Sequence, residues 1–146
     1  MTKQKINPLL ESFDVLIGTW ETESPKFPGF KGQNVFEWFE NGSYVLQHSI
    51  NPHTVPSSTW IIGSDESDES IIALYYDTRI VSRIYQMSLT NDTWKIWRDA
   101  PGFFQRFEGK LSKDGNTLKG QWELSNDGTH WELDFELIYK RLSKKP

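Results

Sequence analysis

Two arginines, Arg83 and Arg98, carry the clearest chemistry in this sequence. If the segment around them folds into antiparallel strands, Arg98 lies between Tyr85 and Gln105 on one face, and Arg83 follows Tyr85 on that face. A guanidinium in an apolar interior is destabilising unless it is paired or hydrogen-bonded. Water, a carboxylate from the first half of the chain, or the anionic head of a ligand could satisfy these two. Our hypothesis is that Arg83 and Arg98 hold a carboxylate or phosphate-like group, while Tyr85 and Gln105 orient it.

Large apolar residues on the same face would enclose the body of such a ligand. They are Trp20, Met87, Trp94, Ile96, Phe107, Trp122, Trp131 and Phe135. In the alternative interpretation these rings fill a solid core, and both arginines lie at a barrel mouth with packed stems and hydrated heads. A barrel of this kind can either be filled or hold one small ligand, so the sequence leaves both interpretations open.

Four turn signals between residues 85 and 139 position these side chains, because they divide the segment into five strands. The signals are Asn91-Asp92, Pro101-Gly102, Asp114-Gly115 and Asp127-Gly128. A two-residue turn fixes which residues face one another, and this register keeps one apolar face inside throughout. Pro-Gly suits a type II turn, so we expect that connection to be longer than two residues.

The same register predicts the pairs between neighbouring strands. The inner pairs are Met87 with Ile96, Ile96 with Phe107, Phe107 with Trp122, Trp122 with Leu133, Gly120 with Phe135 and Leu118 with Leu137. The outer pairs are Lys95 with Glu108, Arg106 with Glu123 and Lys119 with Glu136. Opposite charges at facing positions suit a solvated outer face.

The first half of the chain predicts a short amphipathic helix over residues 8–17 that covers one end of the barrel. Five strands follow, including a hairpin around Asn41-Gly42 and strands over residues 58–64 and 71–76. The loop of residues 23–31 is too rich in proline for a central strand and could be a lid. The predicted fold is therefore all-β, an antiparallel barrel of about ten strands with a short N-terminal helix.

Composition favours a single domain over residues 1–146. Aromatic residues make up 14% of the chain and charged residues 25%, as expected where large rings gather on one face of thin strands. The net charge of -4 argues against nucleic-acid binding, and the lack of cysteine removes disulfides and thiolate chemistry. The N-terminus reads as neither a signal peptide nor a membrane span, so we expect a cytoplasmic protein without a membrane partner.

A short helix, then Gly18-Thr19-Trp20, then about ten antiparallel strands resembles the lipocalin-like or calycin barrels, which include fatty-acid-binding proteins and nitrobindins. The region from Arg79 to Arg141, with RIYQMSL and WKIWRDAPGFFQRFEGKL, looks more specifically like a bacterial domain family of unknown function. The resemblance implies a lipocalin-like barrel over nearly the whole chain and carries no assigned activity. The nitrobindin similarity implies haem as a distant candidate ligand, with His48 as its possible partner, whereas His130 has outward parity.

These features favour a protein that binds a small apolar or acidic amphiphilic molecule without transforming it and without a cofactor. Two other classes stay open. An enzyme could use His48, Glu37 and Tyr44 if they face inward. A self-associating structural module, such as a homodimer, could use the outer aromatic residue Trp97. The acidic run of residues 64–70 lacks the ligand pattern of a calcium loop, so we expect a solvated hairpin there.

Overall fold

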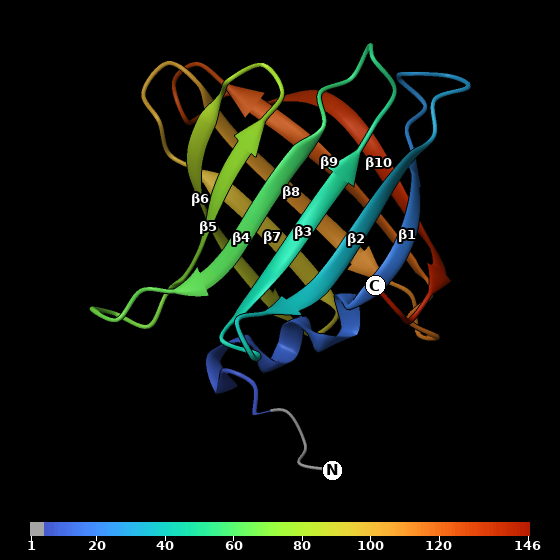
Figure 1. Ribbon diagram of the computed structural model, residues 1–146. Helices are drawn as coiled ribbons and strands as arrows, with labels where there is room; N and C mark the ends of the chain where they lie inside the picture. Colours follow the sequence, from blue (N-terminus) through green and yellow to red (C-terminus); the bar gives the residue numbers. More distant parts are fainter. Residues whose placement is uncertain (1–4) are drawn as a thin grey trace.

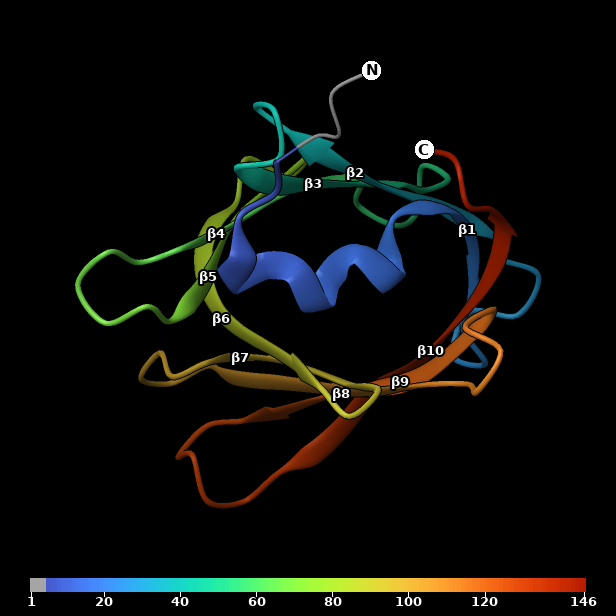
Figure 2. The same cartoon turned by 90° about the horizontal axis from the view of Figure 1, so that it is seen from below.

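A 3-10 helix lies across one end of a closed antiparallel barrel in the computed structural model, which describes residues 5–146 (Figures 1 and 2). The helix is η1 (Pro8–Leu16), and the strands are β1 (Gly18–Glu23), β2 (Gly32–Phe39), β3 (Tyr44–Ile50), β4 (Ser58–Ser64), β5 (Ile71–Asp77), β6 (Ser82–Thr90), β7 (Thr93–Arg98), β8 (Phe104–Leu111), β9 (Thr117–Ser125) and β10 (Glu132–Ser143). Consecutive strands pair, and β1 pairs with β10 to close the barrel. The predicted all-β barrel with its N-terminal helix is confirmed.

The helix η1 closes the lower end of the barrel in Figure 1. Asn7 caps its start, because the Asn7 side chain accepts a 3.0 Å hydrogen bond from the Leu9 backbone N–H, and Pro8 suits the first helical position. The apolar face of the helix is at most 1% exposed and consists of Leu10, Phe13 and Leu16. Burial of these side chains against the strands fixes the helix in place.

Arg141 of β10 ties η1 to the barrel wall. Its guanidinium donates hydrogen bonds to the backbone oxygens of Val15, Ile17 and Gly115 at 2.5, 2.8 and 3.1 Å. It also lies 4.2 Å from the centre of the Trp20 ring, a cation–π distance. Arg141 therefore joins the first and last segments of the fold.

The barrel interior is solid at the helix end. Trp94 is fully buried, and the rings of Phe36 and Phe107 contact it edge to face at 5.8 and 5.5 Å. The rest of this packed half consists of Trp20, Val45, Ile62, Ala73, Met87, Leu89, Leu111 and Leu118. The solid core that the sequence left open as an alternative is thus present in the half of the barrel nearest η1.

The predicted register of β6 to β9 is confirmed. Met87 lies opposite Ile96, and Phe107 lies opposite Ile96 on one side and Trp122 on the other. The predicted outer pairs are also present, namely Lys95 with Glu108 and Arg106 with Glu123. The connection between β7 and β8 spans residues 99–103 and places Gly102 at a φ of 84°, as the longer type II turn requires.

The predicted pairing of β10 with β9 is wrong by two residues. The observed pairs are Trp122 with Phe135, Gly120 with Leu137, Leu118 with Tyr139 and Lys119 with Ile138. The predicted partners of these four residues of β9 were Leu133, Phe135, Leu137 and Glu136. Because the shift is even, Phe135 keeps its inward direction, whereas a bulge between Leu133 and Phe135 leaves Leu133 56% exposed.

Asp127 explains this shift, because it stabilises a connection wider than a two-residue turn. Its Oδ1 accepts 2.8 Å hydrogen bonds from the backbone N–H groups of Thr129 and His130. The wider loop leaves Trp131 on the outer surface, where the Arg106 guanidinium stacks 3.9 Å from the centre of its ring. The prediction that Trp131 encloses an interior ligand is therefore wrong.

The inward face of β3 is opposite to the one considered for His48. Val45 and Gln47 are 0% and 3% exposed, whereas Tyr44 on the other face is 42% exposed. His48 shares the outward face, and its Nδ1 lies 3.2 Å from the Thr59 hydroxyl. The first hairpin therefore directs amide and apolar side chains, and not the histidine, into the barrel.

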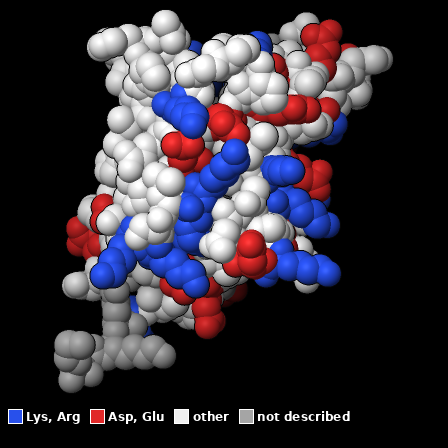
Figure 3. Space-filling view, turned by 90° about the vertical axis from the view of Figure 1, so that its right-hand side faces the viewer, with Lys and Arg blue, Asp and Glu red and all other residues white. Residues whose placement is uncertain are grey.

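Charged side chains of both signs intermingle on the outer surface around β1 and β10 (Figure 3). Lys140 pairs with Glu23 at 2.8 Å and Lys31 with Glu21 at 3.4 Å. Exposed pairs of this kind contribute little stability each but keep this face well solvated. Over residues 5–146, no helix has the length and apolar character needed to cross a membrane.

Candidate ligand-binding cavity

A cavity of about 320 Å³ occupies the half of the barrel away from η1. Its wall combines aromatic rings, uncharged polar groups, two arginines, Arg79 and Arg83, and one carboxylate, Asp134. The rings include Phe27, Trp60, Tyr75, Tyr85, Trp122 and Phe135. A wall that combines aromatic rings with polar groups at defined positions is a feature of small-molecule sites.

The structure divides the predicted site residues into two groups. Arg83, Tyr85, Gln105, Trp122 and Phe135 line the cavity, as does Ile96. Trp20, Met87, Trp94 and Phe107 lie in the packed half below it and are at most 3% exposed. Arg98 ends β7 with the predicted parity, but its side chain is not part of the cavity wall.

Hydrogen bonds join Arg83, Tyr85 and Gln105. Tyr85 donates a 2.8 Å hydrogen bond to Gln105 Oε1, and Arg83 Nη1 donates to the Tyr85 hydroxyl at 3.4 Å. Burial raises the pKa of Tyr85, and the nearby charges of Arg83 and Arg98 oppose that rise. The Tyr85 hydroxyl therefore stays protonated and orients the Gln105 amide.

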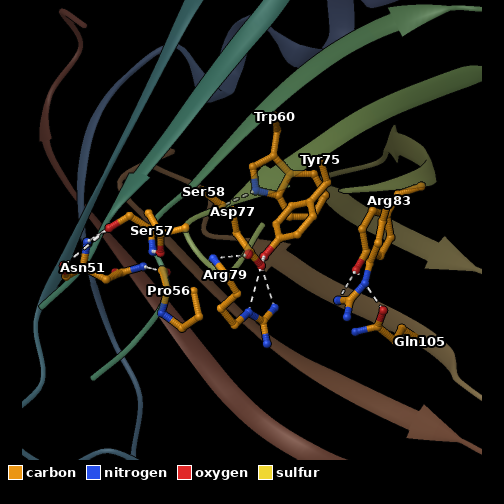
Figure 4. A network of polar contacts seen from close by, with 12 residues as sticks. Asn51, Pro56, Ser57, Ser58, Trp60, Tyr75, Asp77, Arg79, Arg83 and Gln105 are labelled. Atoms are coloured by element: carbon orange, nitrogen blue, oxygen red, sulfur yellow. Dashed lines mark hydrogen bonds and ion pairs between the residues drawn. The ribbon is translucent and has the colours of Figure 1, made fainter. Parts of the chain in front are cut away.

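A second polar network at the mouth is absent from the sequence prediction (Figure 4). Tyr75 donates a 2.5 Å hydrogen bond to Asp77 Oδ2, and Arg79 Nη2 donates to the same oxygen at 2.6 Å. Burial opposes the charge on Asp77, but hydrogen bonds from Arg79 and Tyr75 outweigh it and lower the Asp77 pKa well below its usual range. The alternation of Ala73 and Tyr75 along the strand was the available signal for this inward face.

Of the charged residues that line the cavity in the described part of the chain, Arg79 and Asp134 have partners of opposite charge and Arg83 does not. Arg79 pairs with Asp77, whose side chain is fully buried, and Lys26 pairs with Asp134 at 3.2 Å. Among the described residues no carboxylate lies within ion-pair distance of Arg83. The cavity therefore has one uncompensated positive charge at its edge.

Polar side chains of β1, β2 and β3 form the deep wall of the cavity, which the sequence reasoning missed. Gln47 Nε2 donates a 2.9 Å hydrogen bond to Asn34 Oδ1, and Asn34 Nδ2 approaches the Thr22 hydroxyl at 3.5 Å. The Tyr139 hydroxyl lies beside them; burial raises its pKa, and Gln47 opposes that rise. We refer to Thr22, Asn34 and Gln47 as the amide wall.

The loop of residues 24–31 lines the opening, as expected for a lid. Phe27 contacts Phe135 with ring centres 6.2 Å apart, and Phe30 also belongs to the cavity wall. Lys26 Nζ donates to the backbone oxygen of Asp134 at 2.9 Å, which fastens the loop to β10. These contacts hold the loop against β10 at the opening of the cavity.

A haem held by histidine does not fit this cavity. His48 faces outward from β3, His53 is exposed in the β3–β4 connection, and His130 is exposed in the β9–β10 connection beside Asp127. None of the three lines the cavity. The enzyme site considered from the sequence is likewise not assembled inside, because Glu37 and Tyr44 share the outward direction of His48.

Comparison with known proteins supports the fold. No family model matches the chain, and no curated protein sequence matches it. The crystal structure of Rv2717c from M. tuberculosis is similar, with a TM-score of 0.65 and 12% sequence identity over 94% of this chain and 99% of that chain. The chain thus forms a closed ten-stranded antiparallel β-barrel with a cavity open at one end. At 12% identity, the similarity to Rv2717c extends to this architecture alone.

Proposed function

We propose that this protein is a cytoplasmic, lipocalin-like carrier or sensor that binds a small amphiphilic carboxylic acid in its cavity and releases it unchanged. The observation that carries the proposal is the unpaired Arg83 guanidinium at the edge of an aromatic cavity. A carboxylate would give Arg83 the charge-assisted hydrogen bonds that the protein itself does not provide.

The surroundings of Arg83 support an anionic ligand group. The guanidinium lies 5.3 Å from the Phe103 ring centre and 5.9 Å from the Tyr75 ring centre. These rings reduce its contact with water and restrict the orientation of the guanidinium plane. A bound carboxylate would therefore find the guanidinium partly preorganised. The Tyr85 hydroxyl on its inner side limits how far the head can enter.

The aromatic wall supports an apolar ligand body of limited size. Trp60 packs with Tyr75 and Tyr85 at ring-centre distances of 4.6 and 5.0 Å, and Trp122 completes the same surface. A volume of about 320 Å³ is at the small end of ligand pockets, so the body is a single ring or a short chain.

Binding without chemistry is favoured because the strongest acid–base pair of the cavity is held away from neutral pKa values. Burial and the Asp77 hydrogen bond raise the pKa of Tyr75, while the pKa of Asp77 is lowered. Tyr75 therefore stays protonated and Asp77 ionised near neutral pH, which makes them poor proton carriers.

Calorimetric titration with hydrocinnamate and its uncharged amide, hydrocinnamamide, tests the proposal. The two probes share one apolar body, so their difference reports the carboxylate. We expect the acid to bind roughly ten-fold more tightly or better, with an advantage that shrinks as salt is added. Equal affinity of the two probes would overturn the proposal.

A further inference from the structure

We infer that Gln47 forms a second polar subsite, which accepts a hydrogen bond from a hydroxyl at the buried end of the ligand. The ligand class would then be a hydroxyaryl carboxylic acid, with its acid at Arg83 and its hydroxyl at the amide wall. This inference rests on the proposed function for the acid end and adds an independent requirement at the other end.

The hydrogen bonding of Gln47 is incomplete. Its side chain is 3% exposed and lines the cavity. Nε2 is used by Asn34 at 2.9 Å, but Oε1 has no hydrogen-bond partner among the residues that the structure describes. A buried carbonyl oxygen without a donor is destabilising, and a ligand hydroxyl would supply that donor once a small turn of the amide exposes Oε1, which is itself almost closed to solvent.

Asn34 and Thr22 hold the Gln47 amide in the orientation that leaves Oε1 without a donor. Asn34 is 2% exposed, and its Oδ1 accepts from Gln47 while its Nδ2 approaches Thr22. The amide nitrogen of Gln47 therefore points along the wall. Its oxygen remains as the acceptor, which selects a ligand donor over a ligand acceptor.

Gln47 and Arg83 lie at opposite ends of one row of inward side chains. Gln47 faces Trp60 across β3 and β4, Trp60 faces Tyr75 across β4 and β5, and Tyr75 faces Arg83 across β5 and β6. Three strand spacings separate the ends of the row, or about 14 Å between backbones measured along the curved wall. Both side chains line the same cavity, so one small molecule can contact both.

The middle of this row determines the kind of body that joins the two polar ends. Trp60 and Tyr75 pack edge to face between Gln47 and Arg83, with ring centres 4.6 Å apart and ring planes at 69°. A planar ring of the ligand can stack on the face of one of these rings and contact the edge of the other, with its substituents directed toward the two ends. This arrangement favours an aryl acid with the hydroxyl and the acid on opposite sides of the ring.

Titrating the wild-type protein with para-hydroxyhydrocinnamate and para-fluorohydrocinnamate tests the inference. Fluorine has nearly the size of the hydroxyl but cannot donate a hydrogen bond. We expect the hydroxyl probe to bind roughly ten-fold more tightly. Equal affinity would overturn the inference, because it would mean that Tyr139 or water already satisfies Gln47 Oε1.

Variants then assign the preference to Gln47. Gln47→Met keeps the length of the side chain and removes the acceptor, so the preference for the hydroxyl should disappear. His48→Met, which changes the adjacent outward residue, should retain it. A preference that survives in a folded Gln47→Met protein would also overturn the inference.

A neutral pair of probes separates this inference from the proposed function. If para-propylphenol binds more tightly than propylbenzene while hydrocinnamate gains nothing over its amide, the Gln47 subsite stands and the acid-binding proposal fails. If the acid advantage is present but neither hydroxyl probe exceeds its matched partner, the proposed function stands and the Gln47 subsite is refuted.

Discussion

Tyr75 donates a hydrogen bond of 2.5 Å to the buried carboxylate of Asp77 at the cavity mouth. Arg79 donates to the same oxygen, so this carboxylate is not available to Arg83. Arg83 lies across from Tyr75 on the neighbouring strand but has no carboxylate of its own among the described residues. The cavity wall thus includes Arg79, which is paired with a carboxylate, and Arg83, which is not. That difference distinguishes a structural ion pair from a candidate ligand contact.

Replacement of Asp77 by Asn should make stability less dependent on pH in acid. The Asp77 pKa is lower in the folded than in the unfolded protein, so its stabilisation is complete above the unfolded value of about 4 and is lost as pH falls toward the folded value. We expect Asp77→Asn to lose about 2 kcal/mol at neutral pH and less in acid. Urea unfolding across pH measures this, with the exposed Asp99→Asn as control. A constant difference at every pH would contradict it.

Replacement of Gly120 by Ala should destabilise the packed half. An added Cβ would lie 2.5 Å from Cζ of Phe107 and 2.8 Å from the Glu108 backbone oxygen, and the backbone cannot yield easily inside a paired strand. We expect a loss of about 1–3 kcal/mol in denaturant unfolding.

Gly63→Ala is the matched control, because the nearest atom to its new Cβ is Cδ1 of the exposed Tyr44 ring at 3.1 Å, which can move aside. Equal effects of the two substitutions in β4 and β9 would show that lost glycine flexibility, and not the Phe107 ring, dominates.

Replacement of Arg141 by Met should loosen η1 from the barrel. The variant leaves the backbone oxygens of Val15, Ile17 and Gly115 without their donor and removes the stacking on Trp20. We expect a loss of about 2–4 kcal/mol in thermal or denaturant unfolding.

Arg141→Lys should recover only part of that stability, since an ammonium cannot reach three separated carbonyls as a planar guanidinium does. Full recovery of stability in Arg141→Lys would indicate that the positive charge matters more than the three hydrogen bonds of the guanidinium.

Replacement of Ile80 by Asn should stabilise the protein. Ile80 is 97% exposed in the β5–β6 connection and has a φ of 66°, a backbone region that is unfavourable for a β-branched residue. Asn tolerates this region and no packing is lost, so we expect a gain of up to about 1 kcal/mol. A lower melting temperature of Ile80→Asn would show that the isoleucine makes a contact that offsets the strain.

Local rules predicted the C-terminal half well because its connections are short and its faces are distinct. Two-residue turn signals and alternating apolar residues were enough to pair Met87 with Ile96 and Phe107 with Trp122. The same rules failed to predict the pairing of β9 with β10. The Asp127 side chain accepts backbone hydrogen bonds and stabilises a longer loop than the two-residue turn that Asp127-Gly128 predicts.

The candidate site was harder to predict, since alternation gives the face of a residue but not its depth in the barrel. Arg83 and Arg98 share the inward parity, yet only Arg83 belongs to the cavity wall. Trp94 and Phe107 lie too deep to line the cavity. The amide wall escaped notice because β2 and β3 carry apolar residues on both faces, as Phe36 and Phe39 illustrate.

Calorimetric titration of hydrocinnamate into Arg83→Met and Arg98→Met tests the central claim most directly. The structure places Arg83 in the cavity wall and Arg98 outside it, and both substitutions remove one charge from the same region. We expect Arg83→Met to weaken binding roughly ten-fold or more, and Arg98→Met to change it less than about three-fold through its screened field. Equal losses in the two folded variants, or unchanged affinity in Arg83→Met, would contradict a specific contact between Arg83 and the ligand carboxylate.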